Sequence, residues 1–214
     1  MKNRMNKFTA LILALAVILS PAACGQKAAP ETETKPEPET ADTEKNEQAQ
    51  ETEAPAEKVL VVYFSATGTT KGVAEKIAAV TDADLFEIVP VNGYTDGDLD
   101  WHDSKSRTTH EQNDKSARPE IAGEPVSLEG YTTVFVGFPI WWGEEPRIMD
   151  TFAESYNFDG LTVIPFCTSG SSGIGKSGQN LAELAKSGTW LDGKRLPSNV
   201  SEADLQAWID GLKS

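Results

Sequence analysis

Three continuous apolar runs mark the central strands of this chain. They occupy residues 59–64, 132–138 and 161–166. A run without polar alternation is typical of a parallel strand that is covered on both faces. A shorter run over residues 84–89 contains Glu87 and predicts an edge strand. A fifth strand has weak support, because only residues 189–196 leave room for it and Gly193 interrupts them.

Helical periodicity alternates with these strands. Val73, Ile77 and Val80 form one stripe of a helix predicted over residues 71–80. Further helices are predicted over residues 147–156 and 179–186, and Ser201 with Asp204 predicts the capped start of a last one. The polar stretch 92–129 has weak helical signals around 98–110 and is long for a loop, so we expect it to face a partner or to determine specificity. The alternation predicts an α/β fold with a doubly wound, mostly parallel sheet.

The first 23 residues predict a secretory signal peptide. Basic residues, an apolar run over residues 8–19 and small residues at 20–23 follow one another in the expected order. Cys24 comes next, so this end of the signal resembles a bacterial lipobox, although Pro21 stands where the pattern prefers Leu. We expect Cys24 to be lipidated and the protein to be extracytoplasmic, attached to the membrane through this N-terminal lipid only. The alternative is a simple signal that is cleaved near Ala23.

Composition separates a linker from a domain. Residues 24–57 contain ten acidic residues and three Lys with no aromatic residue, which predicts a disordered acidic linker. Residues 58–214 contain 13 basic and 23 acidic residues, a net charge of −10, and are long enough for one domain with a sizeable core. This charge argues against nucleic acid as a partner. His102 and His110 lie in a polar stretch and predict exposed side chains rather than metal ligands.

The turn after the first strand carries the strongest chemical signal. Four hydroxyls surround a glycine between the strand and the following helix, at Ser65, Thr67, Gly68, Thr69 and Thr70. The N–H groups at a helix N-terminus are unpaired and favour an anion. One helix cap needs one hydroxyl. The excess therefore predicts a seat for a phosphate monoester, with an ordinary capped turn as the alternative.

Two other loops leave the carboxyl ends of central strands. One is Pro139-Ile140-Trp141-Trp142-Gly143, where two adjacent indoles form either a packing plug or a stacking platform for a flat ligand. The other, from Thr168 to Gly173, is rich in serine and glycine. Ligands in such sheets bind at the carboxyl ends of the strands, so we expect all three loops to meet around a planar heteroaromatic phosphate.

At these residues the sequence resembles the flavodoxin family, and within it a branch with a Pro-x-Trp-Trp loop that includes bacterial lipoproteins. The motifs that carry the resemblance are residues 63–70, Arg118-Pro119, residues 137–143, residues 166–173 and Trp208. The resemblance implies a five-stranded parallel sheet in the order 2-1-3-4-5 and bound FMN. It also implies that Ser65, Thr67, Gly68, Thr69 and Thr70 hold the phosphate. The remaining implied contacts are Pro139, Ile140, Trp141, Trp142 and Gly143 at the ring, and Thr168, Ser169, Gly170 and Gly173 at its pyrimidine end.

The resemblance predicts an FMN-binding electron-transfer protein whose partner is a redox protein or a small electron acceptor. Residues 168–178 lack the aromatic residue that many flavodoxins place there, so one flavin face is expected to be open. This favours, as an alternative, an FMN-dependent reductase of quinones or small nitro or azo compounds; a non-redox FMN-binding module is a second alternative. An acidic domain with no evident cation in these loops is expected to lower the reduction potential of the flavin. Cys167 borders the site and is expected to be a buried hydrophobe rather than a redox thiol.

A competing motif overlaps the third loop. Residues 170–177 match the nucleotide-binding pattern G-x-x-x-x-G-K-[ST], with Lys176 and Ser177 at its end. A P-loop NTPase also needs an acidic residue at the end of a neighbouring strand to hold Mg²⁺. The two candidate strands end at Phe64 and Phe138 without one. The P-loop NTPase is therefore a minor alternative.

Overall fold

The computed structural model describes residues 57–212. The predicted signal peptide, most of the predicted linker and Cys24 lie outside the described residues. Within the described part, no helix is both long and apolar enough to cross a membrane.

A parallel sheet forms the centre of the domain. Its strands are β1 (Val59–Phe64), β2 (Asp84–Ile88), β3 (Thr133–Pro139), β4 (Thr162–Thr168), β5 (Thr189–Trp190) and β6 (Lys194–Arg195). They follow the order β2-β1-β3-β4-β5, with β6 also paired to β4. β1, β3 and β4 are almost wholly buried, as their continuous apolar sequences predict. The fold class and the strand order are confirmed.

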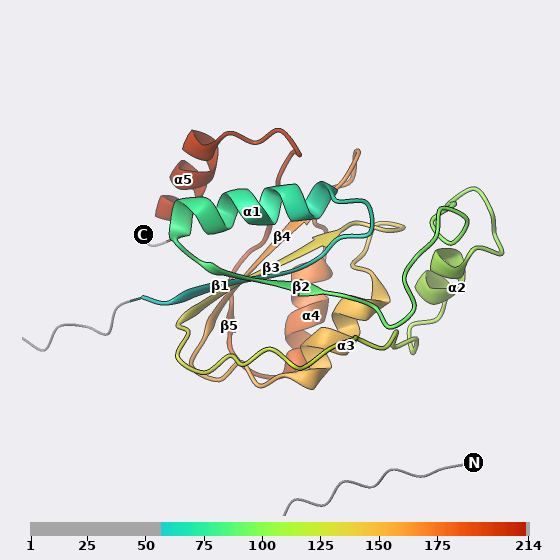
Figure 1. Ribbon diagram of the computed structural model, residues 1–214, viewed down its shortest axis with the longest axis horizontal. Helices are drawn as coiled ribbons and strands as arrows, with labels where there is room; N and C mark the ends of the chain where they lie inside the picture. Colours follow the sequence, from blue (N-terminus) through green and yellow to red (C-terminus); the bar gives the residue numbers. More distant parts are fainter. Residues whose placement is uncertain (1–56, 213–214) are drawn as a thin grey trace, which may run out of the picture. The chain divides into compact units, whose positions relative to one another are not determined.

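Helices cover both faces of this sheet (Figure 1). On one face lie α1 (Thr69–Thr81) and α5 (Glu202–Gly211), which bury Val73, Ile77, Leu205 and Ile209 against the strands. On the other face lie α3 (Arg147–Ser155) and α4 (Ser177–Ala185), with their own apolar cluster. Because α1 and α3 follow neighbouring strands but cover opposite faces, the loops after β1 and β3 diverge and leave a crevice between them.

The fifth strand position is filled by two short pieces. Val163 pairs with Trp190 and Phe166 with Lys194, so three steps along β4 correspond to four along the edge. Val163 and Cys167 accept hydrogen bonds from this edge, which places the nitrogen of Pro165, between them, on the same side. Proline has no N–H to donate there. A Cβ at Gly193 would approach the Pro165 carbonyl oxygen to 2.8 Å. The edge strand, which has one residue more than β4 here, therefore runs close to the backbone of β4 at Gly193.

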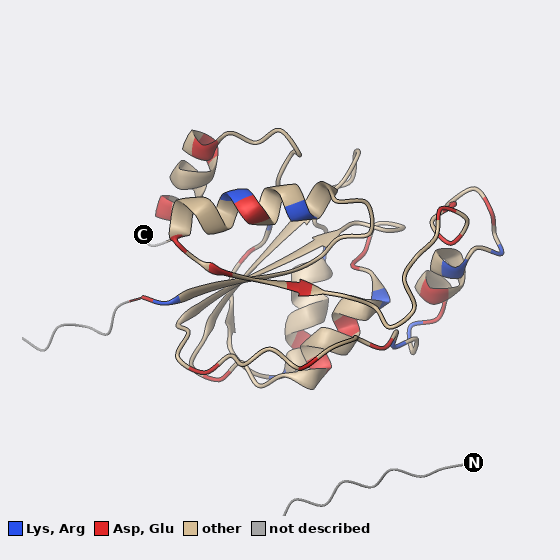
Figure 2. Ribbon diagram, viewed as in Figure 1, with Lys and Arg blue, Asp and Glu red and all other residues tan. Residues whose placement is uncertain are grey.

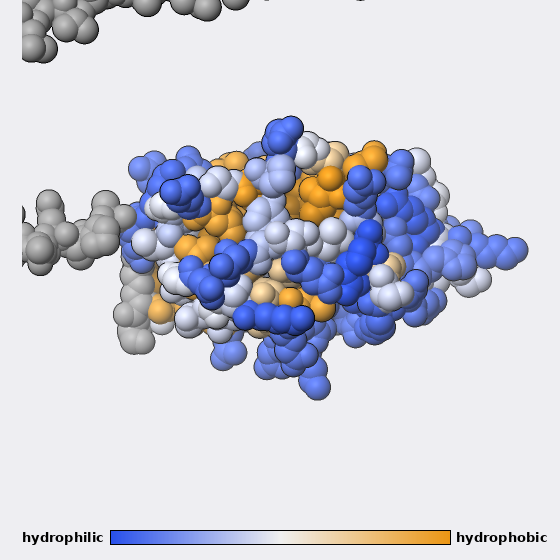
Figure 3. Space-filling view, turned by 90° about the horizontal axis from the view of Figure 1, so that it is seen from below, coloured by the Kyte–Doolittle hydropathy of each residue, from blue (hydrophilic) through white to orange (hydrophobic). Residues whose placement is uncertain are grey.

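The long connection after β2 carries one helix, α2 (Arg107–Asn113), beyond the carboxyl ends of the strands (Figure 1). Ser106 caps this helix and Thr108, Thr109 and Gln112 are buried in it. Acidic and basic side chains both occur at this end of the molecule (Figure 2), and the same end is mostly hydrophilic when the molecule is seen from below (Figure 3). The connection is therefore an ordered structure at the edge where the three loops emerge.

Several element boundaries differ from the sequence predictions. β4 extends to Thr168, so Thr168 ends a strand instead of starting the loop. α4 begins at Ser177 and not at residue 179, and α2 covers only the end of the stretch where helix was signalled. The last helix begins as predicted, because the Ser201 side chain accepts a hydrogen bond from the N–H of Asp204. His102 and His110 are exposed, as predicted.

Candidate functional site

The turn between β1 and α1 leaves the start of the helix uncapped. The cap position is Gly68, which has φ 83° and no side chain to accept a hydrogen bond from the helix. None of the neighbouring hydroxyls takes over this role, although Ser and Thr are good caps. The ordinary capped turn is therefore wrong, and the first N–H groups of α1 remain available to an anion.

The Ser65 hydroxyl in this turn is buried but makes no hydrogen bond within the described chain. Such an orphaned donor is costly unless a ligand or water completes it. Thr67 and Thr69 lie exposed, with their hydroxyl oxygens 3.4 Å apart. The first cation of the helix, Lys71, is paired with Glu87 at 3.2 Å. The donor set is thus hydroxyls and backbone N–H groups, which fits a phosphate monoester.

The three loops meet, as the topology predicts. The Thr70 hydroxyl lies 2.8 Å from that of Thr168, which joins the start of α1 to the end of β4. The Ile140 N–H donates to the Thr168 carbonyl at 3.0 Å, which joins the second loop to the third. Trp141 packs edge-on against Phe64 at the end of β1, with ring centroids 5.5 Å apart. The carboxyl ends of β1, β3 and β4, from which the three loops emerge, therefore lie together at one edge of the sheet.

The two adjacent tryptophans have different environments. Trp141 is partly buried and packs against both Phe64 and Tyr94, so it is held as part of the core. Trp142 is 46% exposed. It occupies a tight turn in which Trp141 and Glu144 exchange two backbone hydrogen bonds, with φ 50° at Trp142 and 83° at Gly143. A left-handed tryptophan is unusual, and such strain is common at functional positions.

This second loop is fastened by a residue that the sequence did not single out. The buried Gln112 side chain donates to the carbonyls of Trp141, at 2.8 Å, and Glu145, at 3.2 Å. These two residues lie at the two ends of the turn, so Gln112 bonds the loop to α2 at both ends. Only the unusual length of the connection after β2 pointed to this segment.

A pocket of about 320 Å³ opens beside Trp142. Its walls include Thr67 from the first loop and Ile140, Trp141 and Trp142 from the second. Leu99, Trp101 and Thr108 from the connection after β2 complete it, and Trp101 is 68% exposed. The pocket is at the small end of the range for ligand sites, is mostly apolar and is lined by three indoles, so it suits a planar ring. The sequence did not predict a contribution from Leu99 or Trp101.

The third loop folds around its own first serine. The Ser169 hydroxyl accepts from the N–H groups of Ser171, at 3.4 Å, and Ser172, at 3.0 Å. Gly170 and Gly173 are exposed. Arg195, at the end of β6, donates to the carbonyls of this loop, so a cation lies against the candidate site although none occurs in the loop itself.

Two buried groups near the site have shifted pKa values. Burial raises the pKa of the Cys167 thiol to about 12, which keeps it protonated and supports its interpretation as a small buried hydrophobe. Burial also raises the pKa of Asp150 to about 6, although Arg147 donates to its carboxylate at 2.9 Å. Arg147 also pairs with Glu144, and this buried network anchors the start of α3. No group of His, Cys, Asp and Glu within the described residues is arranged to hold a metal ion.

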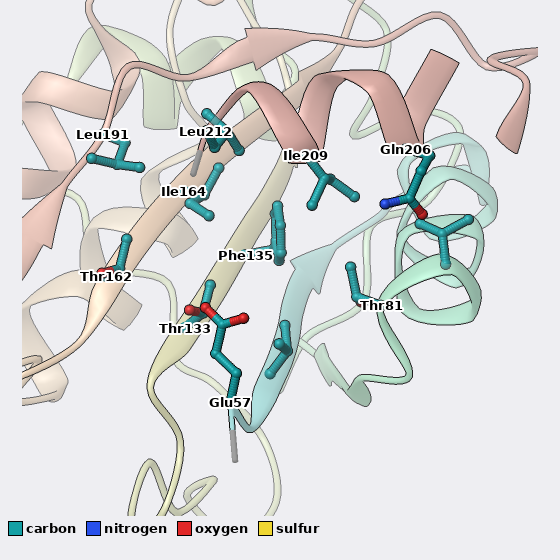
Figure 4. A pocket seen from close by; sticks show the side chains of 12 residues that line it. Glu57, Thr81, Thr133, Phe135, Thr162, Ile164, Leu191, Gln206, Ile209 and Leu212 are labelled. Carbon is teal, nitrogen blue, oxygen red and sulfur yellow. The ribbon is translucent and has the colours of Figure 1, made fainter. Parts of the chain in front are cut away.

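A larger pocket, of about 520 Å³, lies at the opposite end of the strands between α1 and α5 (Figure 4). Its floor is formed by Val59, Phe135 and Ile164 and its rim includes Glu57 and Gln206. It is remote from the three loops and from the hydroxyls of the turn. We therefore place the candidate site at the carboxyl edge despite the smaller volume there.

The sheet order, the crevice and the hydroxyl-rich turn together define a doubly wound flavodoxin-like protein. The chain matches the flavodoxin family over residues 58–212 and belongs to that family. It is similar to a flavoprotein from Bacteroides eggerthii, with 43% identity over 73% of this chain and 98% of that chain and a TM-score of 0.69. It is also similar to a flavoprotein from Bacteroides uniformis, with 44% identity over 72% of this chain and 98% of that chain and a TM-score of 0.68.

A more distant structure shares the fold. It is a flavoprotein from Lactobacillus acidophilus in complex with FMN, with 23% identity over 72% of this chain and 99% of that chain and a TM-score of 0.55. A comparison with curated proteins found no match.

Proposed function

We propose that this protein binds FMN at the carboxyl edge of its sheet and transfers electrons. The observation that carries the proposal is the turn before α1, where the Ser65 hydroxyl is buried with no partner among the residues that the structure describes and where the helix start is uncapped. A phosphate monoester supplies acceptors for both. Membership of the flavodoxin family and the FMN bound by the Lactobacillus acidophilus flavoprotein support the choice of ligand.

The residues around the crevice fit the different parts of FMN. The turn, with Ser65, Thr67, Gly68, Thr69 and Thr70, would hold the phosphate. The ring would lie against the loop from Pro139 to Gly143, where exposed Trp142 is the better candidate for stacking because Trp141 is committed to the core. Thr168, Ser169, Gly170 and Gly173 would contact the pyrimidine end. Bound FMN would supply the electron-transfer chemistry.

Flavin retention tests the proposal directly. The purified protein is incubated with FMN, freed of excess, and examined by visible spectroscopy and a fluorescence titration. We expect a yellow protein with quenched flavin fluorescence and reversible reduction by dithionite. A folded protein that retains no flavin would contradict FMN binding, whereas retention without reversible reduction would favour the non-redox module.

The lack of an aromatic residue within residues 168–178 favours a second candidate, an FMN-dependent reductase of quinones or small nitro or azo compounds. With Trp142 stacked on one face of the flavin, the other face would be open to a planar acceptor. The test is to mix the reduced, FMN-loaded protein with a short-chain quinone under anaerobic conditions and follow flavin reoxidation. Saturation with quinone concentration indicates a binding site, and a strictly linear dependence indicates a carrier without one.

We also propose that the protein is attached to the extracytoplasmic face of the membrane by a lipid on Cys24, with no other membrane contact. The small residues before Cys24 support this placement. Metabolic labelling with a fatty acid tests it: the wild type should be labelled and found in the membrane fraction, and Cys24→Ser should be neither. An unlabelled, secreted wild type would support the simple signal peptide.

The P-loop alternative receives little support from the geometry. Lys176 stands at the cap of α4, and the two candidate strands, β1 and β3, end at Phe64 and Pro139 without an acidic residue. Binding of ATP with Mg²⁺ that is lost in Lys176→Ala would revive this alternative.

A further inference from the structure

We propose that Arg195 is a positioning residue for the flavin: it shapes the third loop and places a positive charge at the pyrimidine end of the site. The inference rests on the proposed FMN function. It concerns a residue 22 positions beyond the last predicted contact, Gly173, on a strand piece that the sequence barely signals.

The Arg195 guanidinium donates hydrogen bonds to three consecutive carbonyls of the third loop. One terminal nitrogen donates to Ser169 at 2.9 Å and to Gly170 at 3.3 Å, and the other donates to Ser171 at 3.3 Å. A planar fork with several N–H donors can span such a set, whereas the compact ammonium of lysine cannot. Arg195 therefore fixes the direction of three successive peptide groups.

This arrangement determines which loop groups face outward. With the carbonyls drawn to Arg195 and the N–H groups of Ser171 and Ser172 bound to the Ser169 hydroxyl, the loop is a closed turn. Within residues 57–212 the N–H of Gly170 has no acceptor, so it is available to a ligand. Thr168, directly before this turn, contacts Thr70 in the predicted phosphate seat, so the loop begins beside that seat.

Among the residues that the structure describes, no carboxylate forms an ion pair with Arg195, whereas Lys71 at the phosphate side is paired with Glu87. A positive charge beside the pyrimidine ring stabilises the negative charge that a flavin gains on reduction. Arg195 therefore raises the reduction potential and opposes the lowering expected from an acidic domain.

The placement of Arg195 follows from the break in the edge strand. The extra residue between β5 and β6 sets Arg195 opposite Cys167, one residue before the loop. Lys194 points to the other face, where its Nζ lies 5.8 Å from the centre of the Trp208 ring. Lys194→Met and Arg195→Met thus remove the same charge from the same strand on opposite sides of the sheet, which gives a matched control.

The experiment compares wild type, Arg195→Met, Arg195→Lys and Lys194→Met in three measurements. These are the Kd values for FMN and riboflavin by fluorescence quenching, the reduction potential by spectroscopic titration, and backbone hydrogen exchange of residues 168–173 without flavin. Because Arg195 is exposed, the variants should fold. Riboflavin lacks the phosphate, so it separates an effect at the ring from one at the phosphate seat.

We expect Arg195→Met to raise the Kd values for FMN and riboflavin by the same factor, about tenfold, which corresponds to the loss of one charge-assisted interaction. It should also lower the reduction potential and speed exchange in the loop. Arg195→Lys should keep a reduction potential close to that of the wild type, but the amide hydrogens of its third loop should exchange as fast as in Arg195→Met. Lys194→Met should behave as wild type in all three measurements.

Three results would overturn the inference. They are wild-type Kd values and potential in Arg195→Met, a loss of FMN affinity with riboflavin unaffected, and unchanged exchange in the loop. A wild type that binds neither flavin contradicts the proposed function and, with it, the role toward the flavin; hydrogen exchange then decides the loop-shaping role alone.

Discussion

Ser65→Ala should change stability and FMN affinity in opposite directions. Among residues 57–212, the Ser65 hydroxyl is buried and has no hydrogen-bond partner. A buried unsatisfied group costs about 1–3 kcal/mol, so its removal should stabilise the flavin-free protein by about 1 kcal/mol. For a domain of about this size, that corresponds to a rise in Tm of roughly 2–4 °C.

The same substitution should weaken FMN binding. A hydrogen bond from a hydroxyl to a charged phosphate contributes about 1.5–3 kcal/mol, so the Kd should rise about 10- to 100-fold. Riboflavin, which lacks the phosphate, should bind Ser65→Ala and wild type equally. The assays are thermal unfolding without flavin and fluorescence titration with each flavin.

Ser104→Ala is the control, because it makes the same chemical change at an exposed serine outside the site. It should alter neither quantity. If Ser65→Ala lowers the Tm and leaves the Kd for FMN unchanged, the hydroxyl has a structural role and the assignment of the turn as a phosphate seat is wrong.

Four further substitutions test the surroundings of the site. Gln112→Ala removes both side-chain donors that fasten the second loop, so urea unfolding should show a loss of about 1–2 kcal/mol and FMN should bind more weakly; unchanged affinity would exclude a role for α2 at the site. Trp142→Ala should lower the free energy of unfolding by less than about 1 kcal/mol, because the side chain is half exposed, but it should restore flavin fluorescence. Trp141→Ala should lower the free energy of unfolding by about 3 kcal/mol. The reverse pattern would make Trp141 the stacking residue. Burial raises the pKa of Asp150 to about 6 from 3.8, so the folded state holds this proton more tightly, and the contribution to stability falls as pH rises toward and through 6. Asp150→Asn should flatten this part of the stability curve measured between pH 5 and 7.5, and equal slopes in both proteins would contradict the shift.

Local sequence pattern was sufficient for the fold and for the three loops. Continuous apolar runs identified β1, β3 and β4, and the hydroxyl-rich turn identified the start of α1, because each signal lies within a few neighbouring residues. The strand order came from family resemblance and is confirmed by the pairing. The convergence of the loops followed from topology alone, since parallel strands carry their carboxyl ends to one edge.

The residues that complete the site could not be predicted, because their contacts join distant parts of the chain. Gln112 lies 29 residues from Trp141, and Arg195 lies 26 residues from Ser169. Nothing near Gln112 or Arg195 in the sequence indicates these partners, and β6 is too short for a periodic signal. The extension of β4 to Thr168 was missed for a similar reason: the pairing of Thr168 with Pro139, 29 positions earlier in the chain, decides where the strand ends.

The interrupted edge beside β4 has a consequence for how the protein behaves at high concentration. An uninterrupted outer strand offers a row of free N–H and C=O groups on which a second molecule can add its own strand, which leads to aggregation. Here Pro165 withholds one donor and the chain divides into two pieces of two residues each. Neither piece is long enough to act as a template. The interruption opposite Pro165 therefore makes this edge of the sheet a poor template for a second copy of the domain, while β2 forms the other edge.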